Sequence, residues 1–367
     1  MSQAFHGGKL LEAEREFGLP RDQFVDFSSN LNVFAPSIST VEWQRWAEEI
    51  GRYPEADPAT LCNSLAEFYG LNRNYILPTC GASEALYLAA RLFTGHKVAI
   101  IEPGFSDYSR SFETVDCDCG HITLTQSMWF EPIEGWANDL EPFDVVVLGN
   151  PNNPTGSLQR RDDFTRLFEG RGWRSKSWII DEAFMEFIDG PDHQTLLSEI
   201  ERFPSVIVVR SLTKSWRIPG LRLGFLATAG RIDRLRRMQP PWSVNSLAEA
   251  WSKRFLTDRY RKELSGSLES LRIEKQRFVK RLSDVPGIRL HVGTANFVLV
   301  ELVSHLLDAG NLYEELGRRG LLVRVCDSFR GMPRGRFLRV AVRAAADNER
   351  LVRELTSLCD QKMRRFA

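Results

Sequence analysis

The fold is decided by two stretches of the chain, Ser177-Trp178-Ile179-Ile180-Asp181-Glu182-Ala183-Phe184 and Ser205-Val206-Ile207-Val208-Val209-Arg210-Ser211-Leu212-Thr213-Lys214. Each contains a short apolar run, with Asp181 closing the first and Lys214 following the second. In a chain that alternates strands and helices, such runs are strands of one sheet, and ligands bind at the carboxyl edge where they end. The pattern predicts that an acidic residue and a lysine lie together at that edge.

A lysine at such an edge is either a solvated surface charge or a functional amine. Ser211 and Thr213 place hydroxyls beside Lys214, and Arg222 adds a fixed cation a few residues later. These groups can bind a phosphate and leave the amine to react, because a nearby cation and partial desolvation push an amine toward its neutral, nucleophilic form. Pyridoxal phosphate (PLP) carries both a phosphate and an aldehyde, and an aspartate at its ring nitrogen completes its electronics. Asp181 is placed to be that aspartate.

Composition narrows the class of protein. The 367 residues are 43% hydrophobic and 26% charged, which suits one large domain and a smaller one. Since 48 Lys and Arg balance 48 Asp and Glu, no whole-chain charge favours nucleic acid or an anionic membrane. We find no secretory leader and no run of ~18 apolar residues, and the six scattered cysteines lack metal-ligand spacing. We therefore expect a cytoplasmic protein without a metal, a nucleic-acid partner or a membrane partner.

The order of the predicted elements gives the domains. Continuous apolar runs separated by helical stretches predict an α/β fold with a mostly parallel central sheet. Past Gly230 the chain reads as long helices and then short strands, which predicts a smaller α+β domain. The expected division is 1–40 as an N-terminal arm, 41–240 as the large domain and 241–367 as the small domain. Within the last, Ala248 to about Leu282 reads as one helical stretch and Leu321–Val325 as one strand.

Three further segments are predicted to reach the same sheet edge. Gly81–Ala90 opens a helix whose free amides favour an anion, although an ordinary capped helix would read the same way. Phe105 and Tyr108 follow a strand and could cover a flat ring, although aromatics more often pack in a core. The segment Gly149–Gly156 holds two prolines and three asparagines, so it is a rigid polar turn.

With these motifs in place, the chain resembles fold-type I PLP enzymes of the aspartate aminotransferase superfamily over nearly its full length. The resemblance is carried by Asn-Pro-Thr-Gly, Asp-Glu-Ala-Phe, Ser-Leu-Thr-Lys and the arginine downstream. It implies that Lys214 bonds the cofactor aldehyde, that Asp181 lies at the ring nitrogen and that Asn153 lies at the ring oxygen. The residues implied to hold the cofactor phosphate and ring are Ala82, Ser83, Phe105, Ser211 and Arg222. Tyr53 would reach the cofactor phosphate of a partner subunit, which implies a homodimer.

Two groups within that superfamily are similar to this chain. Histidinol-phosphate aminotransferases usually have a tyrosine where Phe184 stands. The L-threonine-O-3-phosphate decarboxylases of cobalamin biosynthesis have phenylalanine there and begin with a His-Gly-Gly arm, as this chain does at residues 6–8. Other segments similar to those decarboxylases are Asp26–Asn32, Arg52–Asp57, Arg210–Lys214, Pro241–Asn245 and Arg339–Arg343.

The resemblance implies decarboxylation of L-threonine O-3-phosphate to (R)-1-amino-2-propanol phosphate, with a small amino-acid phosphate as the substrate. Its phosphate and carboxylate are assigned to His6, Gly7, Asn30, Arg324 and Arg339. Ala82, in place of an acidic residue, and Val33-Phe34-Ala35-Pro36 depart from those decarboxylases, so phosphoserine stays open as a substrate. A histidinol-phosphate-type aminotransferase and a non-enzymatic PLP-binding domain are the alternatives, because no motif encodes which bond at the α carbon is broken.

Overall fold

The computed structural model describes residues 7–170 and 172–364 of the chain. Its largest element is a seven-stranded sheet in the order β2-β8-β7-β6-β5-β3-β4. Strand β8 runs antiparallel to both neighbours and the other adjacent strands are parallel, which confirms the mostly parallel sheet. The bounds are Ile76–Cys80 (β2), Lys97–Glu102 (β3), Asp118–Thr123 (β4), Val145–Gly149 (β5), Ser177–Asp181 (β6), Val206–Ser211 (β7) and Leu223–Ala227 (β8).

Both faces of this sheet are buried, as the continuous apolar runs predict. Ile179 points to one face, where it packs with residues of α4, α5 and α8. Ile180 points to the other face, where α3, α6 and α9 contribute to the core. These helices span Ala59–Tyr69 (α3), Gly81–Arg91 (α4), Asp107–Glu113 (α5), Arg161–Glu169 (α6), Ile232–Met238 (α8) and Ser246–Phe255 (α9).

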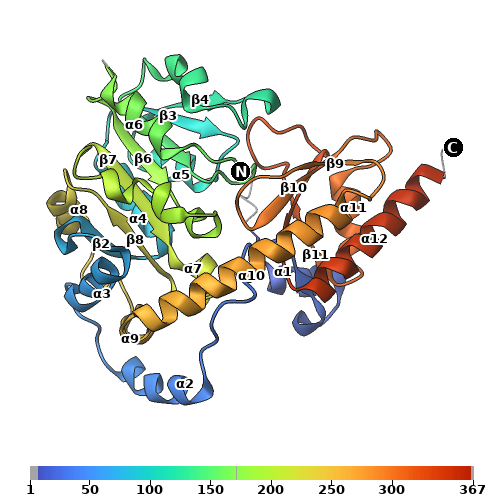
Figure 1. Cartoon of the computed structure of the whole chain (residues 1–367), viewed down its shortest axis with the longest axis horizontal. Helices are drawn as coiled ribbons and strands as arrows, with labels where there is room; N and C mark the ends of the chain where they lie inside the picture. The colour runs from blue at the N-terminus through green and yellow to red at the C-terminus, as the bar shows by residue number, and fades with distance from the viewer. Residues whose placement is uncertain (1–6, 171, 365–367) are drawn as a thin grey trace.

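A second, antiparallel sheet has the order β12-β13-β10-β9 and lies beside helices α11 and α12 (Figure 1). The bounds are Ile288–His291 (β9), Phe297–Leu302 (β10), Arg324–Val325 (β12), Phe337–Ala341 (β13), Ala309–Gly317 (α11) and Ala345–Arg364 (α12). The prediction of one strand over Leu321–Val325 is wrong. Its first two residues form β11 (Leu321–Leu322), which pairs with β1 (Val25–Asp26) near the N-terminus, and only its last two join β13.

One long helix, α10 (Asp258–Leu282), runs past both sheets and ends beside the smaller one (Figure 1). The predicted helical stretch from Ala248 to Leu282 is therefore two helices, because Leu256 and Thr257 leave the helical backbone between α9 and α10. Among the helices of the described ranges, none is long and apolar enough to cross a bilayer.

The N-terminal segment lies against the smaller sheet and its helices. Helix α1 (Leu10–Phe17) places the ring of Phe17 against Tyr313 of α11, with ring centroids 5.6 Å apart. The chain then passes through β1 to α2 (Thr40–Trp46), which projects away from both sheets (Figure 1). The domain boundaries at residues 40 and 240 stay predictions.

Candidate active site

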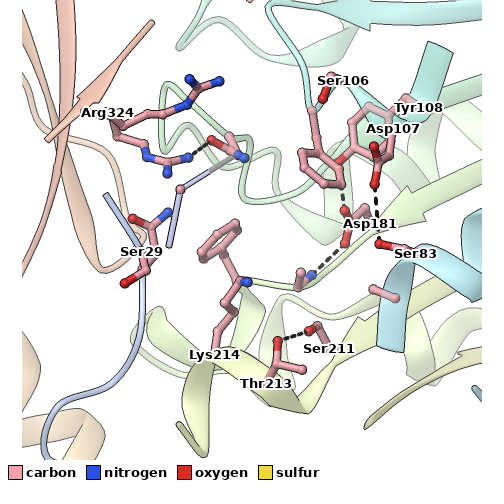
Figure 2. A pocket seen from close by; sticks show the side chains of 18 of the residues that line it. Ser29, Ser83, Ser106, Asp107, Tyr108, Asp181, Ser211, Thr213, Lys214 and Arg324 are labelled. Carbon is pink, nitrogen blue, oxygen red and sulfur yellow. Dashed lines mark hydrogen bonds between the residues drawn. The ribbon is translucent and has the colours of Figure 1, made fainter. Parts of the chain in front are cut away.

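A cavity of about 270 Å³ lies at the carboxyl ends of β5, β6 and β7, where the smaller sheet faces the larger one. Asp181 and Lys214 both line it (Figure 2). Ten more of the predicted site residues line the same cavity, namely Gly7, Asn30, Ala82, Ser83, Phe105, Asn153, Ser211, Arg222, Arg324 and Arg339. The roles of these residues remain predictions, but twelve side chains or backbones from distant parts of the sequence meet in one place.

Lys214 follows β7 in the short helix α7 (Leu212–Ser215), and Figure 2 shows its side chain directed into the cavity. Its backbone carbonyl accepts a hydrogen bond from the Asn32 amide at 2.9 Å, which holds the lysine against the N-terminal segment. Burial and the charges of Arg339 and Arg222 lower the pKa of Lys214 to about 8, although Asp181 acts in the opposite direction. A substantial share of this amine is therefore neutral near physiological pH, as a nucleophilic lysine requires.

Asp181 ends β6 and is 7% exposed. One carboxylate oxygen accepts the Ala183 amide at 2.9 Å and the other accepts the Tyr108 hydroxyl at 2.9 Å. Burial raises the pKa of Asp181, and these two hydrogen bonds together with the charge of Lys214 offset part of the rise. A buried carboxylate is stable when it faces a cation, so this site suits a protonated ring nitrogen.

The start of α4, the Arg222 side chain and strand β8 at Gly224 form a concave anion site beside the lysine. Gly81 starts α4, and a Cβ at that position would lie 2.5 Å from Arg222 Nη2, so the guanidinium rests against the glycine. A Cβ on Gly224 would lie 2.8 Å from the Ala82 amide nitrogen, so the strand approaches the start of α4 closely. The free amides of α4 and the Arg222 charge both favour a phosphate.

The hydroxyls around this anion site already have partners. Ser211 Oγ and Thr213 Oγ1 lie 2.8 Å apart, and Ser83 Oγ lies 3.4 Å from Asp107 Oδ2 (Figure 2). Either Ser211 or Thr213 can accept from the other hydroxyl and donate its own proton to an anion, whereas Ser83 donates its proton to Asp107 and would have to turn it toward a phosphate. The arrangement therefore fits the phosphate site that the sequence predicts from Ser83, Ser211 and Arg222.

Arg339 connects the smaller sheet to the polar turn after β5. Its guanidinium donates to Asn153 Oδ1 through Nη1 and to the Ser28 carbonyl through Nη2 at 2.9 Å. Burial and the nearby charge of Arg324 lower the pKa of Arg339 to about 10, so it remains a cation at neutral pH. Within the described structure Arg339 Nε and Asn30 Oδ1 are buried without a hydrogen-bond partner, so polar groups stand unused at the cavity wall.

The N-terminal segment closes one side of the cavity. Asp26 accepts hydrogen bonds from the Ser28 hydroxyl at 2.6 Å and from the Ser29 hydroxyl at 2.8 Å. Ser28 Oγ in turn accepts the Gly8 amide at 3.0 Å, and a Cβ on Gly7 would overlap the Ser28 carbonyl oxygen. The backbone at Gly7 therefore approaches Ser28 more closely than any side chain would allow. His6, which is predicted to bind substrate, lies outside the described residues.

Arg324 lies beside Arg339 in the smaller sheet and is held by two neighbours. Its Nη2 donates to Ser328 Oγ at 2.6 Å, and its guanidinium carbon lies 5.2 Å from the centre of the Phe329 ring. Tyr53 differs from the other predicted site residues, because it does not line the cavity. Its side chain is 87% exposed and its ring packs on Trp242 at 5.6 Å.

Some residues at the site were not predicted as such. Tyr108 was expected at most to cover a flat ring, but its hydroxyl binds Asp181. Its position three residues after Phe105, at the start of α5, was the available signal. Ser29 and Ser328 also line the cavity. Ser29 lies beside Asn30 in the segment Asp26–Asn32, which was the available signal, whereas nothing in the sequence around Ser328 distinguishes it from a surface serine.

The cavity can be compared with the cofactor that the sequence suggested. It offers an amine of lowered pKa, a buried carboxylate and an anion site, together with the Phe105 ring, and these match the aldehyde, ring nitrogen, phosphate and flat ring of PLP. Phe184 lines the cavity without a hydroxyl and packs edge-on against Phe297 at 5.2 Å. Over the described ranges no group of three or more His, Cys, Asp or Glu side chains could hold a metal ion. The residues present fit PLP.

Comparisons with known proteins agree with this geometry. The family model described as aminotransferase class I and II matches residues 22–358. Threonine-phosphate decarboxylase of Salmonella typhimurium is 32% identical over 360 residues, 96% of each chain. The adenosylcobalamin biosynthesis bifunctional protein of Leptospira interrogans is 25% identical over 95% of this chain and 40% of its own length. The structure of histidinol-phosphate aminotransferase from Clostridium acetobutylicum is 28% identical, with a TM-score of 0.81, and the match covers 91% of this chain and 99% of that chain.

Proposed function

The chain belongs to the aminotransferase class I and II family, and from that premise we propose that it is a PLP-dependent lyase. The proposed reaction is decarboxylation of L-threonine O-3-phosphate to (R)-1-amino-2-propanol phosphate in cobalamin biosynthesis. One observation carries the proposal: the N-terminal segment and two arginines of the smaller sheet line the same cavity as Lys214. A substrate with two anionic groups needs such cations in addition to the cofactor site.

The proposed cofactor site uses residues at or just after the carboxyl ends of five strands, β2, β3, β5, β6 and β7, together with Arg222, which precedes β8. Asp181 would face the ring nitrogen, Asn153 the ring oxygen and Phe105 the ring face. The cofactor phosphate would be held by Ala82, Ser83, Ser211 and Arg222. When bound, PLP supplies an aldehyde that condenses with amines and a ring that accepts the electrons of a bond breaking at the α carbon.

The protein itself contributes a proton donor, Lys214, and a fixed charge, Asp181, to the proposed reaction. With a pKa of about 8, Lys214 can carry a proton at neutral pH and give it to the α carbon after the carbon dioxide has left. The bond between the α carbon and the carboxylate breaks, and the new bond is the one to that proton. Asp181 would serve as the fixed negative charge opposite a protonated ring nitrogen; burial raises its pKa, and the hydrogen bonds from Tyr108 and Ala183 favour its charged form.

Substrate orientation is assigned to the cations and amides opposite Lys214. Arg324 and Arg339, with Asn30 and the backbone of Gly7, would bind the substrate's carboxylate and phosphate. His6 is proposed as a further ligand in the same arm. Binding energy from the remote phosphate can fix the angle of the reacting bond, because an anion held at one end limits rotation at the other.

We further propose three functional segments and a homodimer. Residues 1–40 act as the substrate-binding arm, 41–240 as the PLP-binding domain and 241–367 as the small domain. The dimer is supported by Tyr53, whose side chain is 87% exposed and lies on the half-exposed Trp242. Large aromatic side chains that are exposed to solvent on neighbouring positions are typical of a subunit interface. At such an interface Tyr53 would reach the partner's cofactor phosphate.

The decisive experiment mixes the purified protein, PLP and L-threonine O-3-phosphate and measures carbon dioxide and the amine product. We expect the two in equal amounts, with no requirement for an oxoacid. The alternative is a histidinol-phosphate-type aminotransferase, favoured by the 28% identity to the enzyme from Clostridium acetobutylicum. Turnover that depends on an oxoacid and releases no carbon dioxide would favour that alternative. O-phosphoserine, run in parallel, tests the related decarboxylase reaction.

A further inference from the structure

A buried carboxylate that the proposed mechanism does not use lies just outside the cavity. Glu102 is the last residue of β3 and is 5% exposed. Its Oε2 accepts the Gly104 amide at 2.8 Å, immediately before Phe105 in the chain. This bond fixes the turn that carries Phe105 into the cavity.

The other oxygen of Glu102 faces two basic side chains. Glu102 Oε1 lies 3.1 Å from His121 Nδ1 of β4 and 4.0 Å from Arg330 Nε. Arg330 comes from the smaller sheet's side of the molecule, in the turn between β12 and β13. The carboxylate thus joins segments that are more than 200 residues apart.

The turn that Arg330 belongs to also holds a proposed substrate ligand. Ser328 and Phe329 line the cavity, and they are the two neighbours that fix the Arg324 guanidinium. Gly331, which follows Arg330, has φ +80°, and a Cβ on it would overlap Thr123 Cγ2 at the end of β4. The turn therefore lies directly against the edge of the larger sheet, where Glu102 of β3 pairs with Thr123 of β4.

The charge state of Glu102 determines how strongly the turn that contains Arg330 is held against the edge of the larger sheet. Burial raises the pKa of Glu102 to about 7, while burial and Arg330 lower the pKa of His121. The hydrogen bond to His121 can survive protonation of Glu102, because the donor and acceptor exchange roles. The attraction to Arg330 needs the negative charge. The other ionisable groups that act here are Tyr108, which senses Glu102, and Glu113, which senses His121.

We propose that Glu102 is a positioning residue for the substrate site. Its carboxylate ties the Phe105 turn, through the Gly104 amide, to the Arg330 turn, and so sets where Ser328 and Phe329 hold Arg324. The inference builds on the proposed function, since Arg324 is assigned to the substrate anion. Glu102 touches neither the cofactor site nor the substrate and acts only through these turns.

The test uses Glu102→Gln, Arg330→Ala and the double variant, with KM for L-threonine O-3-phosphate and kcat measured at pH 6 and pH 8. Glutamine keeps an acceptor for the Gly104 amide but loses the charge. At pH 8 we expect each single change to raise KM about threefold with kcat nearly constant, since a partly exposed ion pair contributes little. At pH 6 the wild-type carboxyl is largely protonated, so the Glu102→Gln difference should nearly vanish. The double variant should be no worse than either single one.

A matched control is Arg334→Ala, which removes an arginine of the same turn for which no carboxylate partner is found in the described structure; its KM should stay at the wild-type value. Hydrogen exchange of residues 326–332 gives a readout that needs no turnover. Corrected for intrinsic rates, protection should fall in wild type as the pH drops through about 7 and should stay low in Glu102→Gln.

The proposal would be overturned if wild type and Glu102→Gln showed equal hydrogen exchange at every pH. It would also be overturned if the effects of Glu102→Gln and Arg330→Ala on KM were additive in the double variant. If wild type fails to decarboxylate threonine phosphate, the proposed function fails instead. The exchange comparison still decides the role of Glu102 in that case.

Discussion

The hydrogen bond from Tyr108 to Asp181 gives the sharpest test of how the site holds its cofactor. The change is Tyr108→Phe, which removes the hydroxyl that Asp181 Oδ2 accepts at 2.9 Å and leaves the ring. Because the carboxylate is 7% exposed, little water can replace the lost donor. A hydrogen bond to a charged group contributes about 1.5–3 kcal/mol, which corresponds to about 10- to 150-fold in affinity. The pKa of Asp181, already raised by burial, rises further when a donor is lost.

The assay titrates cofactor-free protein with PLP and follows the visible absorbance, and then records kcat/KM against pH. We expect PLP affinity to fall by at least about tenfold, and the acidic limb of the profile to move to higher pH. Gly149→Ala is a second route to the same loss, since a Cβ there would lie 2.7 Å from the Tyr108 oxygen. Tyr75→Phe, which removes a hydroxyl outside the cavity, is the control. Unchanged affinity and an unchanged acidic limb in Tyr108→Phe would refute this reasoning.

Four other expectations follow from the same geometry. Lys214→Ala should reduce product formation to background while the far-ultraviolet circular dichroism stays native; appreciable turnover would remove the lysine from the mechanism. Gly7→Ala should raise KM about tenfold or more and leave PLP affinity unchanged, because the added Cβ overlaps the Ser28 carbonyl oxygen and displaces the arm; an unaltered KM would show that the arm does not bind substrate. Glu102 has a pKa of about 7 in the folded protein against an ordinary 4.5, so the folded state binds the extra proton between these values and stability falls as pH rises through them. Urea unfolding should show wild type losing about 3 kcal/mol relative to Glu102→Gln between pH 4.5 and pH 7, and a constant difference would contradict the buried position. Phe184→Tyr places a hydroxyl in the cavity wall, and we expect a detectable oxoacid-dependent side reaction beside decarboxylation; an unchanged product ratio would show that position 184 does not influence the choice of reaction.

The sequence predicted those features that depend on neighbours along the chain. Apolar runs fixed which residues end a strand, and in a parallel sheet the strand ends share one edge, so Asp181 and Lys214 could be placed together. The same logic placed Ser211 and Asn153 in the cavity.

Features that depend on how the two sheets meet could not be predicted. Leu321 and Arg324 belong to one apolar run, yet they pair with different strands. Leu321 pairs with β1, which lies near the N-terminus, and Arg324 pairs with β13, which lies near the C-terminus. The bond between Tyr108 and Asp181 likewise joins two segments through the order of the sheet rather than through spacing. The tie between Glu102 and Arg330 depends on where the smaller sheet lies against the larger one, which no local pattern encodes.

The central claim is that one amine, Lys214 Nζ, bonds the aldehyde of PLP. Borohydride reduction of the PLP-loaded protein, followed by proteolysis and mass spectrometry, tests it most directly. The account predicts that the reduced cofactor is found on the peptide that contains Lys214, and that Lys214→Ala carries none. A label on another lysine such as Lys275, or no label at all, would contradict the account.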